Sequence, residues 1–333
     1  MKFFTRLSLF PALFVILLIF TSCGSTGSTP ASTNASTPTS LTVYAALTEA
    51  NGKLLAKAFE SYAPGSKVTV VTGGTGALLT RIKAEKAAGS LHADVLLLAD
   101  PTAMPGLDEQ QILASYKPTN ASQLPASFQD AHWSGAFSFN NVIIYHKGMS
   151  LPVPSSWQDL TSGKYQNQVE LGDPAYSGTT LGMVGYLSQT YNWSYFSNLK
   201  KNNAITVQST NTVGTDVAAG RVNIGITLDS VVRALLAKGS PIEVVWPSDG
   251  AIPVPAPVSI VAGHENALSH KFVDWLFSSG GQAAVEQLGY APALGSSSMI
   301  PAHTKLASVD WSQIVQKRTS LLEQFHAIFA KAQ

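Results

Sequence analysis

The chain has 333 residues, of which 45% are hydrophobic and only 12% are charged, and its formal net charge is +1. This balance is typical of a compact globular protein and excludes a disordered one. Lysine and arginine form no cluster anywhere in the sequence. Nucleic-acid binding, which depends on a basic surface, is therefore not expected.

The first 40 residues predict an export signal, an anchor and a tether. Two basic residues precede an almost wholly apolar stretch at 7–20, which is the order found in secretory signals. That stretch is shorter than the about 20 apolar residues that span a bilayer. Cys23 follows small residues and resembles the lipidation site of bacterial lipoproteins, the alternative being a cleavage site with an incidental cysteine. We expect a signal peptide at 1–22, followed by a flexible Ser/Thr-rich tether at 23–40 that begins with a lipidated Cys23. The lipid on Cys23 would hold the protein to the outer face of the cytoplasmic membrane.

Strands and helices alternate in the first part of the body. Apolar and β-branched runs predict strands at 41–46, 67–72 and 93–98, and helical spacing predicts helices at 50–62 and 77–88. This order indicates a parallel α/β sheet. Because ligands bind such sheets beyond the carboxyl ends of the strands, we expect the site at 46–48, 72–76 and 99–101.

The rest of the chain departs from this simple alternation. A long strand at 137–145 has no helix of its own, and a Pro-rich stretch at 252–258 cannot be helical, so both are predicted to cross between two lobes. Further strands are expected at 169–174, 221–227 and 242–246, and further helices at 157–160, 177–190, 270–280, 281–288 and 311–331.

Several motifs follow the order and spacing of a known family. They are Thr72-Gly73-Gly74-Thr75-Gly76, Ala93-Asp94-Val95 with Ala99-Asp100, Gly172-Asp173-Pro174-Ala175-Tyr176-Ser177-Gly178-Thr179, Gly225-Ile226-Thr227-Leu228-Asp229 and Ala291-Pro292. Through these motifs the chain resembles the extracellular solute-binding proteins of ABC importers, in the branch with ferric-iron-binding and 2-aminoethylphosphonate-binding members.

The resemblance implies an α/β fold of the periplasmic-binding-protein type, with two lobes that are joined by two crossing strands and close on a ligand. Lobe 1 would comprise residues 41–140 and 256–300, lobe 2 residues 141–255, and a C-terminal helical segment residues 301–333. The resemblance also implies a monomer whose partners are a small-molecule ligand and an ABC permease with its ATPase subunit.

Two segments rich in glycine and hydroxyl residues open helices and are candidates for binding an anion. They are Gly74-Thr75-Gly76 in lobe 1 and Ser177-Gly178-Thr179 in lobe 2. Unpaired N–H groups and the helix dipole favour negative charge at such positions, and glycine allows close approach. The alternative is that each segment only caps its helix. Facing each other across the lobes, the two segments would hold one oxyanion.

Five other residues complete the predicted ligand-binding set. Thr48 lies at the end of the first strand, and Asp229 closes a buried strand, where it would pair with a ligand amine or else begin a helix. Asp100 starts an Asp-Pro turn that is either structural or in contact with the ligand. Tyr176 would lay its ring against ligand carbons or pack internally, and the resemblance implies that Asn211 belongs to a polar loop at the ligand.

We expect a binding protein rather than an enzyme, with no cofactor and no metal site. The sequence lacks HExxH, GxSxG, GxxxxGK and CxxC motifs, and its histidines show no metal-ligand spacing. Iron-binding relatives carry adjacent tyrosines soon after the strand that matches 221–227, whereas residues 228–232 here contain none. The expected solute is a small anion such as a phosphonate or a phosphate ester. The alternatives are an iron(III) carrier and an exported enzyme acting on a small phosphorylated substrate.

Overall fold

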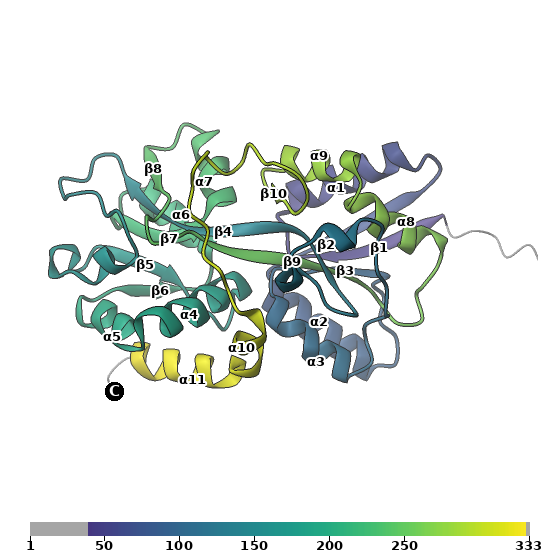
Figure 1. The fold of residues 1–333 in the computed structure, drawn as a ribbon, viewed down its shortest axis with the longest axis horizontal. Helices are drawn as coiled ribbons and strands as arrows, with labels where there is room; N and C mark the ends of the chain where they lie inside the picture. Colours follow the sequence, from purple (N-terminus) through teal and green to yellow (C-terminus); the bar gives the residue numbers. More distant parts are fainter. Residues whose placement is uncertain (1–38, 331–333) are drawn as a thin grey trace, which may run out of the picture. The chain divides into compact units, whose positions relative to one another are not determined.

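A computed structural model describes residues 39–330 of the protein (Figure 1). The strands are β1 (Ser40–Ala45), β2 (Lys67–Thr72), β3 (Val95–Leu97), β4 (Ser134–His146), β5 (Val169–Gly172), β6 (Ile205–Val207), β7 (Ile224–Leu228), β8 (Ile242–Val245), β9 (Ile252–Ile260) and β10 (Ala291–Pro292). The helices are α1 (Glu49–Tyr62), α2 (Thr75–Ala87), α3 (Met104–Glu109), α4 (Gly178–Tyr191), α5 (Ser194–Lys201), α6 (Thr210–Ala218), α7 (Asp229–Leu236), α8 (Ala267–Leu276), α9 (Ser279–Gln287), α10 (Trp311–Gln316) and α11 (Arg318–Phe329), with a 3-10 helix η1 (Pro101–Ala103). The predicted signal peptide, Cys23 and the tether up to residue 38 lie outside the described residues.

Two parallel groups of strands flank a pair of long antiparallel strands. Along the sheet the order is β2-β1-β3-β9-β4-β7-β5-β6, and β8 and β10 both pair with β4. The pairs β1–β2, β1–β3, β5–β6 and β5–β7 are parallel, while β9 and β4 are antiparallel to each other and to their neighbours β3 and β7. The long strands β4 and β9 join the two groups (Figure 1). They are the predicted crossing strands, and the two-lobed α/β architecture is confirmed.

Each parallel group has its own hydrophobic core. In lobe 1, alternate residues of β1 such as Leu41 and Val43 pack with Phe59 of α1 and Phe272 of α8. The lobe 2 core centres on Trp157, Leu171 and Ile226, and it includes Trp311, Ile314, Leu321 and Phe325 of the C-terminal helices. All strands of this sheet and all of these cores lie within residues 39–330, so this part of the chain can fold by itself.

Several predicted elements differ from the observed ones. The single helix expected at 311–331 is two helices, because Lys317 leaves helical geometry between α10 and α11. The sequence-based reading also missed α5, β6 and α6. Asn211, expected in a loop, lies in the first turn of α6, whose N-cap is Ser209. The exact lobe boundaries remain a prediction.

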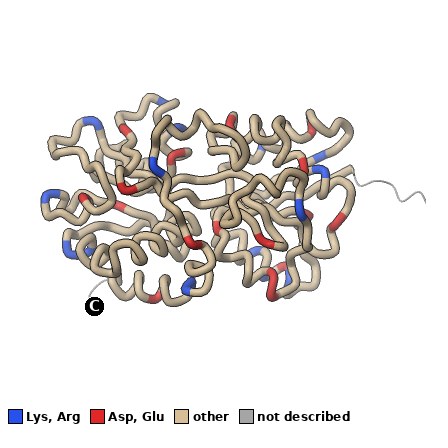
Figure 2. Tube along the Cα trace, viewed as in Figure 1, with Lys and Arg blue, Asp and Glu red and all other residues tan. Residues whose placement is uncertain are grey.

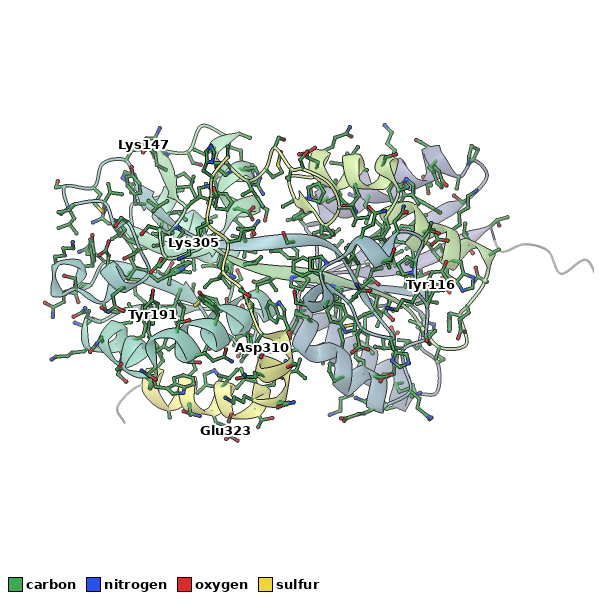
Figure 3. All side chains as sticks on the ribbon, viewed as in Figure 1. Tyr116, Lys147, Tyr191, Lys305, Asp310 and Glu323 are labelled. Atoms are coloured by element: carbon green, nitrogen blue, oxygen red, sulfur yellow. The ribbon has the colours of Figure 1, made fainter. Side chains whose placement is uncertain are left out.

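Charged side chains are dispersed over the described residues. Figure 2 shows lysine and arginine interspersed with aspartate and glutamate along the trace, without a basic stripe. Figure 3 shows Lys305 and Asp310 on the segment between β10 and α10, and Lys147 and Glu323 on other parts of the chain. Within residues 39–330, no helix is long and apolar enough to cross a membrane.

Candidate functional site

The predicted site residues lie where strands of the two parallel groups end and helices begin. Thr48 caps α1, and its Oγ1 accepts a hydrogen bond from the Asn51 amide at 3.2 Å. Gly74 is the N-cap of α2, Ser177 is the N-cap of α4, and Asp229 is the first residue of α7. Because parallel strands share one carboxyl edge, each lobe presents its helix starts on one side.

The starts of α2 and α4 lie close together across the lobes. A Cβ atom placed on Gly76 would lie 3.6 Å from the Ala175 carbonyl oxygen and 3.7 Å from that of Tyr176, just before the N-cap of α4. A Cβ atom on Gly178 would lie 2.1 Å from the Cβ atom of Asp100, in the segment that follows β3. In this arrangement each helix start is therefore covered by residues of the other lobe. A ligand can enter between them only when the lobes move apart.

The hydroxyl groups of both segments already take part in hydrogen bonds within the protein. Thr75 is buried, and its Oγ1 accepts a hydrogen bond from the Ala99 amide at 3.3 Å. The Ser177 Oγ accepts from the Thr180 amide at 3.3 Å and lies 3.0 Å from the Thr179 Oγ1. Ser177 thus caps α4, as the alternative interpretation predicted. Ligand binding by the same hydroxyls remains a prediction, because a serine or threonine oxygen can accept one bond and donate another.

Asp229 is engaged by four donors within the protein. Its Oδ1 accepts from the amides of Asn140 at 3.0 Å and Ser230 at 2.9 Å, and its Oδ2 accepts from the Asn140 Nδ2 at 2.9 Å and the Arg233 Nη2 at 2.8 Å. Only 2% of Asp229 is exposed. These contacts favour the alternative reading, in which Asp229 begins a helix, over a partner for a ligand amine.

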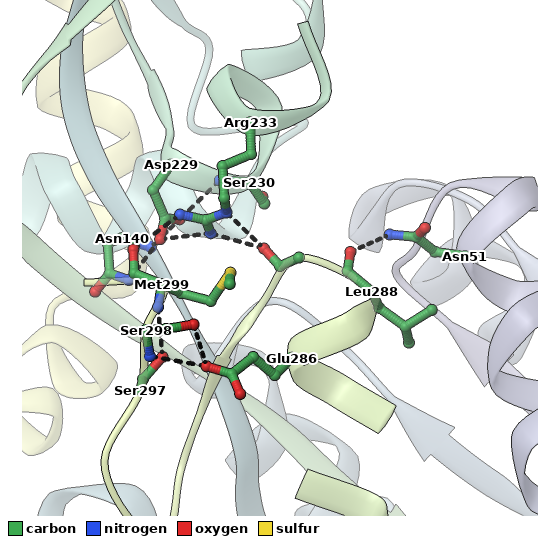
Figure 4. Close-up of polar contacts among 11 residues, drawn as sticks. Asn51, Asn140, Asp229, Ser230, Arg233, Glu286, Leu288, Ser297, Ser298 and Met299 are labelled. Atoms are coloured by element: carbon green, nitrogen blue, oxygen red, sulfur yellow. Dashed lines mark hydrogen bonds and ion pairs between the residues drawn. The ribbon is translucent and has the colours of Figure 1, made fainter. Parts of the chain in front are cut away.

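Arg233 extends this network into lobe 1, as the close-up in Figure 4 shows. Its guanidinium donates to the Gly289 carbonyl at 2.7 and 3.1 Å and to the Met299 carbonyl at 3.1 Å. The neighbouring Asn51 donates to the hydroxyl of Tyr290 at 2.8 Å. Burial raises the pKa of Tyr290, so this phenol stays neutral. Lobe 2 is thereby tied to lobe 1 beside the crossing strand β4.

The remaining candidates differ in exposure. Asp100 is buried, and its Oδ1 accepts from the amide and the hydroxyl of Thr102 at 2.9 and 2.6 Å, so it has the structural role of capping η1. Tyr176 is 54% exposed, so its ring is free to meet a ligand. Thr48 and Asn211 are exposed at the starts of their helices.

Sequence reasoning missed Asn140, Arg233 and Arg318, which hold the site together. The spacing of Asp229 and Arg233, four residues apart on a helix, is a signal that could have been read. Arg318 reaches Asp100 from 218 positions away, and local pattern reading cannot find such a pair.

No metal cage is apparent among the described residues. Within residues 39–330, no three histidine, cysteine, aspartate or glutamate side chains gather as a metal site would require. Two surface cavities of about 410 and 840 Å³ include none of the predicted binding residues in their lining. The larger one separates α2 and α3 from α10 and α11 and includes Thr102 and Arg318 in its lining.

Comparison with known proteins identifies relatives of this fold and sequence. The family model described as bacterial extracellular solute-binding protein matches residues 41–291. A periplasmic protein of Salmonella typhimurium named for binding 2-aminoethylphosphonate is 23% identical over 296 residues, which cover 81% of this chain and 86% of that protein. A periplasmic-binding protein of Sinorhizobium fredii named for an ABC transporter is 26% identical over 309 residues, with 85% of each chain covered.

Solved structures show the same fold at low identity. The periplasmic binding protein AfuA from Actinobacillus pleuropneumoniae, with fructose-6-phosphate bound, aligns with a TM-score of 0.76 at 23% identity, covering 88% of this chain and 99% of AfuA. Iron-bound HitA from Pseudomonas aeruginosa aligns with a TM-score of 0.74 at 18% identity, covering 87% of this chain and 99% of HitA.

Proposed function

The chain belongs to the bacterial extracellular solute-binding proteins, and from this premise we propose that it captures a small organic anion between its two lobes and delivers it to the permease of an ABC importer. The family consists of transport proteins, which confirms the expectation of a binding protein rather than an enzyme. The proposed solute is a phosphonate such as 2-aminoethylphosphonate or a phosphate ester, the compounds named for two relatives.

One observation carries the choice of an anion. At the facing strand ends, the carboxylates of Asp100 and Asp229 are already paired with arginines of this chain. The groups left for a ligand are neutral hydroxyls and the N–H groups at helix starts, as at Ser177 and Thr75. Such groups, at the positive ends of helix dipoles, favour a negatively charged ligand.

Capture follows from closure of the lobes. A solute that first meets lobe 1 gains contacts with lobe 2 only after the lobes come together. This difference in contacts is what shifts the equilibrium from open to closed. The closed protein then docks on the permease, and ATP hydrolysis takes place in the partner subunit.

A thermal-shift screen of residues 39–333 tests the solute class. At 100-fold saturation a ligand stabilises the folded state by about 2.7 kcal/mol. We expect a shift with 2-aminoethylphosphonate or fructose-6-phosphate. A shift with ferric citrate or ferric chloride alone would instead establish the iron carrier, the second candidate, which rests on the likeness to HitA. Turnover of a phosphate ester would establish an enzyme.

A matched pair of variants separates ligand contact from capping. Ser177 and Ser278 are both N-caps whose Oγ accepts from an amide of the first turn, at 3.3 and 3.1 Å. Replacing either by alanine costs about 1 kcal/mol of stability. If Ser177 binds the solute, Ser177→Ala weakens binding while Ser278→Ala leaves it unchanged. Equal affinities for the two variants would remove Ser177 from the site.

We also propose that the mature protein is a lipid-anchored monomer outside the cytoplasmic membrane. Support comes from Cys23 and its preceding signal, which lie outside the described residues. Metabolic labelling with tritiated palmitate should mark the parent and not Cys23→Ser. Equal labelling of both proteins would refute the anchor, and a dimer in analytical ultracentrifugation would refute the monomer.

A further inference from the structure

The C-terminal helices belong to lobe 2 by packing. A Cβ atom on Gly182 of α4 would lie 2.5 Å from the Trp311 ring, and one on Gly185 would lie 2.8 Å from Ile314. Phe325 of α11 meets Phe196 of α5 edge to face at 5.6 Å. Contacts this close leave no room for sliding, so α10 and α11 move with lobe 2.

The segment also contacts lobe 1, where α10 lies beside η1 and Arg318 makes the polar contacts. The Arg318 guanidinium lies 3.3 Å from the Asp100 Oδ2 and donates from Nε to the Thr102 Oγ1 at 3.1 Å. The side chain of Asp100 is 2% exposed and that of Arg318 is 34% exposed. Asp100 thus divides its oxygens, because Oδ1 caps η1 inside lobe 1 while Oδ2 faces the guanidinium from the other lobe.

Lobe 2 also covers Asp100 from a second direction. Gly178, at the start of α4, sits directly against the Cβ atom of Asp100. Among the ion pairs of residues 39–330, Arg318 supplies the cation for Asp100. Separating the lobes would therefore pull a buried carboxylate from its counter-charge and expose it. Charge-assisted bonds of this kind are stronger than neutral ones, and breaking a buried pair is unfavourable.

We propose that Arg318, with Asp100 and Thr102, forms a latch by which the C-terminal helices hold the two lobes closed. Arg318 lies beyond residues 41–291, the part that matches the family model. It biases the equilibrium between open and closed forms before any ligand binds, and it slows release of a bound solute. The latch rests on the arrangement of the lobes and not on the identity of the solute.

The test measures lobe separation without a ligand. Residues 39–333 contain no cysteine, so Lys57→Cys on α1 and Lys201→Cys on α5, both exposed, accept spin labels without background. Pulsed electron resonance then gives the distribution of distances between the lobes. With Arg318→Met we expect the ratio of open to closed protein to rise at least about fivefold. The matched control is Arg221→Met, whose ion pair with Asp216 lies within lobe 2.

The outcome decides the proposal in either direction. A shift to longer distances in Arg318→Met but not in Arg221→Met supports the latch, and Arg318→Gln repeats the test should the methionine variant fail to fold. An unchanged distribution in a folded Arg318 variant overturns the latch. Because no solute enters the measurement, an incorrect proposal for the transported anion would leave this result unaffected.

Discussion

Gly178 offers a direct test of closure, because adding one methyl group there affects the contact between the lobes. In Gly178→Ala the new Cβ would lie 2.1 Å from the Asp100 Cβ, 2.7 Å from its Cγ and 2.9 Å from the Ala99 carbonyl oxygen. Carbon atoms attract at about 3.5 Å, so the lobes must separate by roughly 1.4 Å at this point. All three atoms belong to lobe 1, whereas Gly178 belongs to lobe 2, so the clash is relieved by opening.

The expected loss of solute affinity follows from the free-energy cost of inserting a methylene group into a packed contact. That cost is about 1–3 kcal/mol. Applied to the closed form alone, it weakens solute affinity by roughly fivefold to 150-fold. Each lobe keeps its own core, so circular dichroism should be unchanged. Isothermal titration with the solute identified by thermal shift measures the affinity directly.

A second glycine at the same contact is the control. A Cβ atom on Gly76 meets lobe 2 at 3.6 Å or more, which is ordinary van der Waals distance. Gly76→Ala forces no movement of the lobes, so any loss of affinity in this variant measures contact of the predicted binding segment with the solute. Equal affinity of Gly178→Ala and the parent would refute closure through this contact. Equal losses in Gly76→Ala and Gly178→Ala would show that both glycines act through contact with the solute and not through closure.

Two further predictions concern buried carboxyl groups. Arg233→Met leaves Asp229 buried without its cation and should lower the free energy of unfolding in urea by about 3–5 kcal/mol. The control Arg221→Met breaks an exposed pair with Asp216 and should lower it by less than about 1 kcal/mol. Equal losses in the two variants would contradict the role of the buried pair. Burial and the nearby Asp216 raise the pKa of Glu170 from 4.5 to about 7, while Arg221 lowers it. The folded state thus holds a proton that the unfolded chain releases, so stability falls as pH rises from 4.5 to 7. Glu170→Gln should remove this decline and exceed the parent by up to about 3 kcal/mol at pH 8; parallel stability curves would contradict it.

Local pattern was sufficient for the elements with strong apolar runs, and insufficient where packing overrides propensity. Apart from β6, the strands of both parallel groups follow apolar or β-branched runs such as Val68 to Val71, and they were predicted within a few residues. Seven of the nine residues of α6 are threonine, asparagine, glycine or valine, which are weak helix formers. It is held by packing instead, since Val213 and Val217 lie over Gly225, where an added Cβ would be 2.5 and 3.0 Å away.

The position of the candidate residues at helix starts was predictable, but the pairing of their charges was not. Strand ends and helix caps are local features, so Thr48, Gly74 and Ser177 were found from sequence, and the structure places them at helix starts. A carboxylate can bind a ligand only if no arginine is already paired with it, and the fold decides which arginines lie nearby. Arg318 lies in a helix near the C-terminal end of the chain. The helix break at Lys317, just before Arg318, contains no glycine or proline from which it could have been predicted.

The pairing of carboxylates with basic side chains bears on the alternative that the protein carries iron(III). Three aspartates follow strands at the candidate site, and each has a basic partner: Asp100 with Arg318, Asp173 with His326 at 3.0 Å, and Asp229 with Arg233. Iron(III) requires hard anionic oxygen donors, so it would have to displace one of these partners or bring its own anion. Displacing Arg318 or Arg233 would leave a cation without its buried carboxylate. If the protein is the iron carrier, ferric ion should therefore bind only together with an anion such as citrate. Binding of ferric ion alone in the thermal-shift screen would show that a carboxylate is released for the metal.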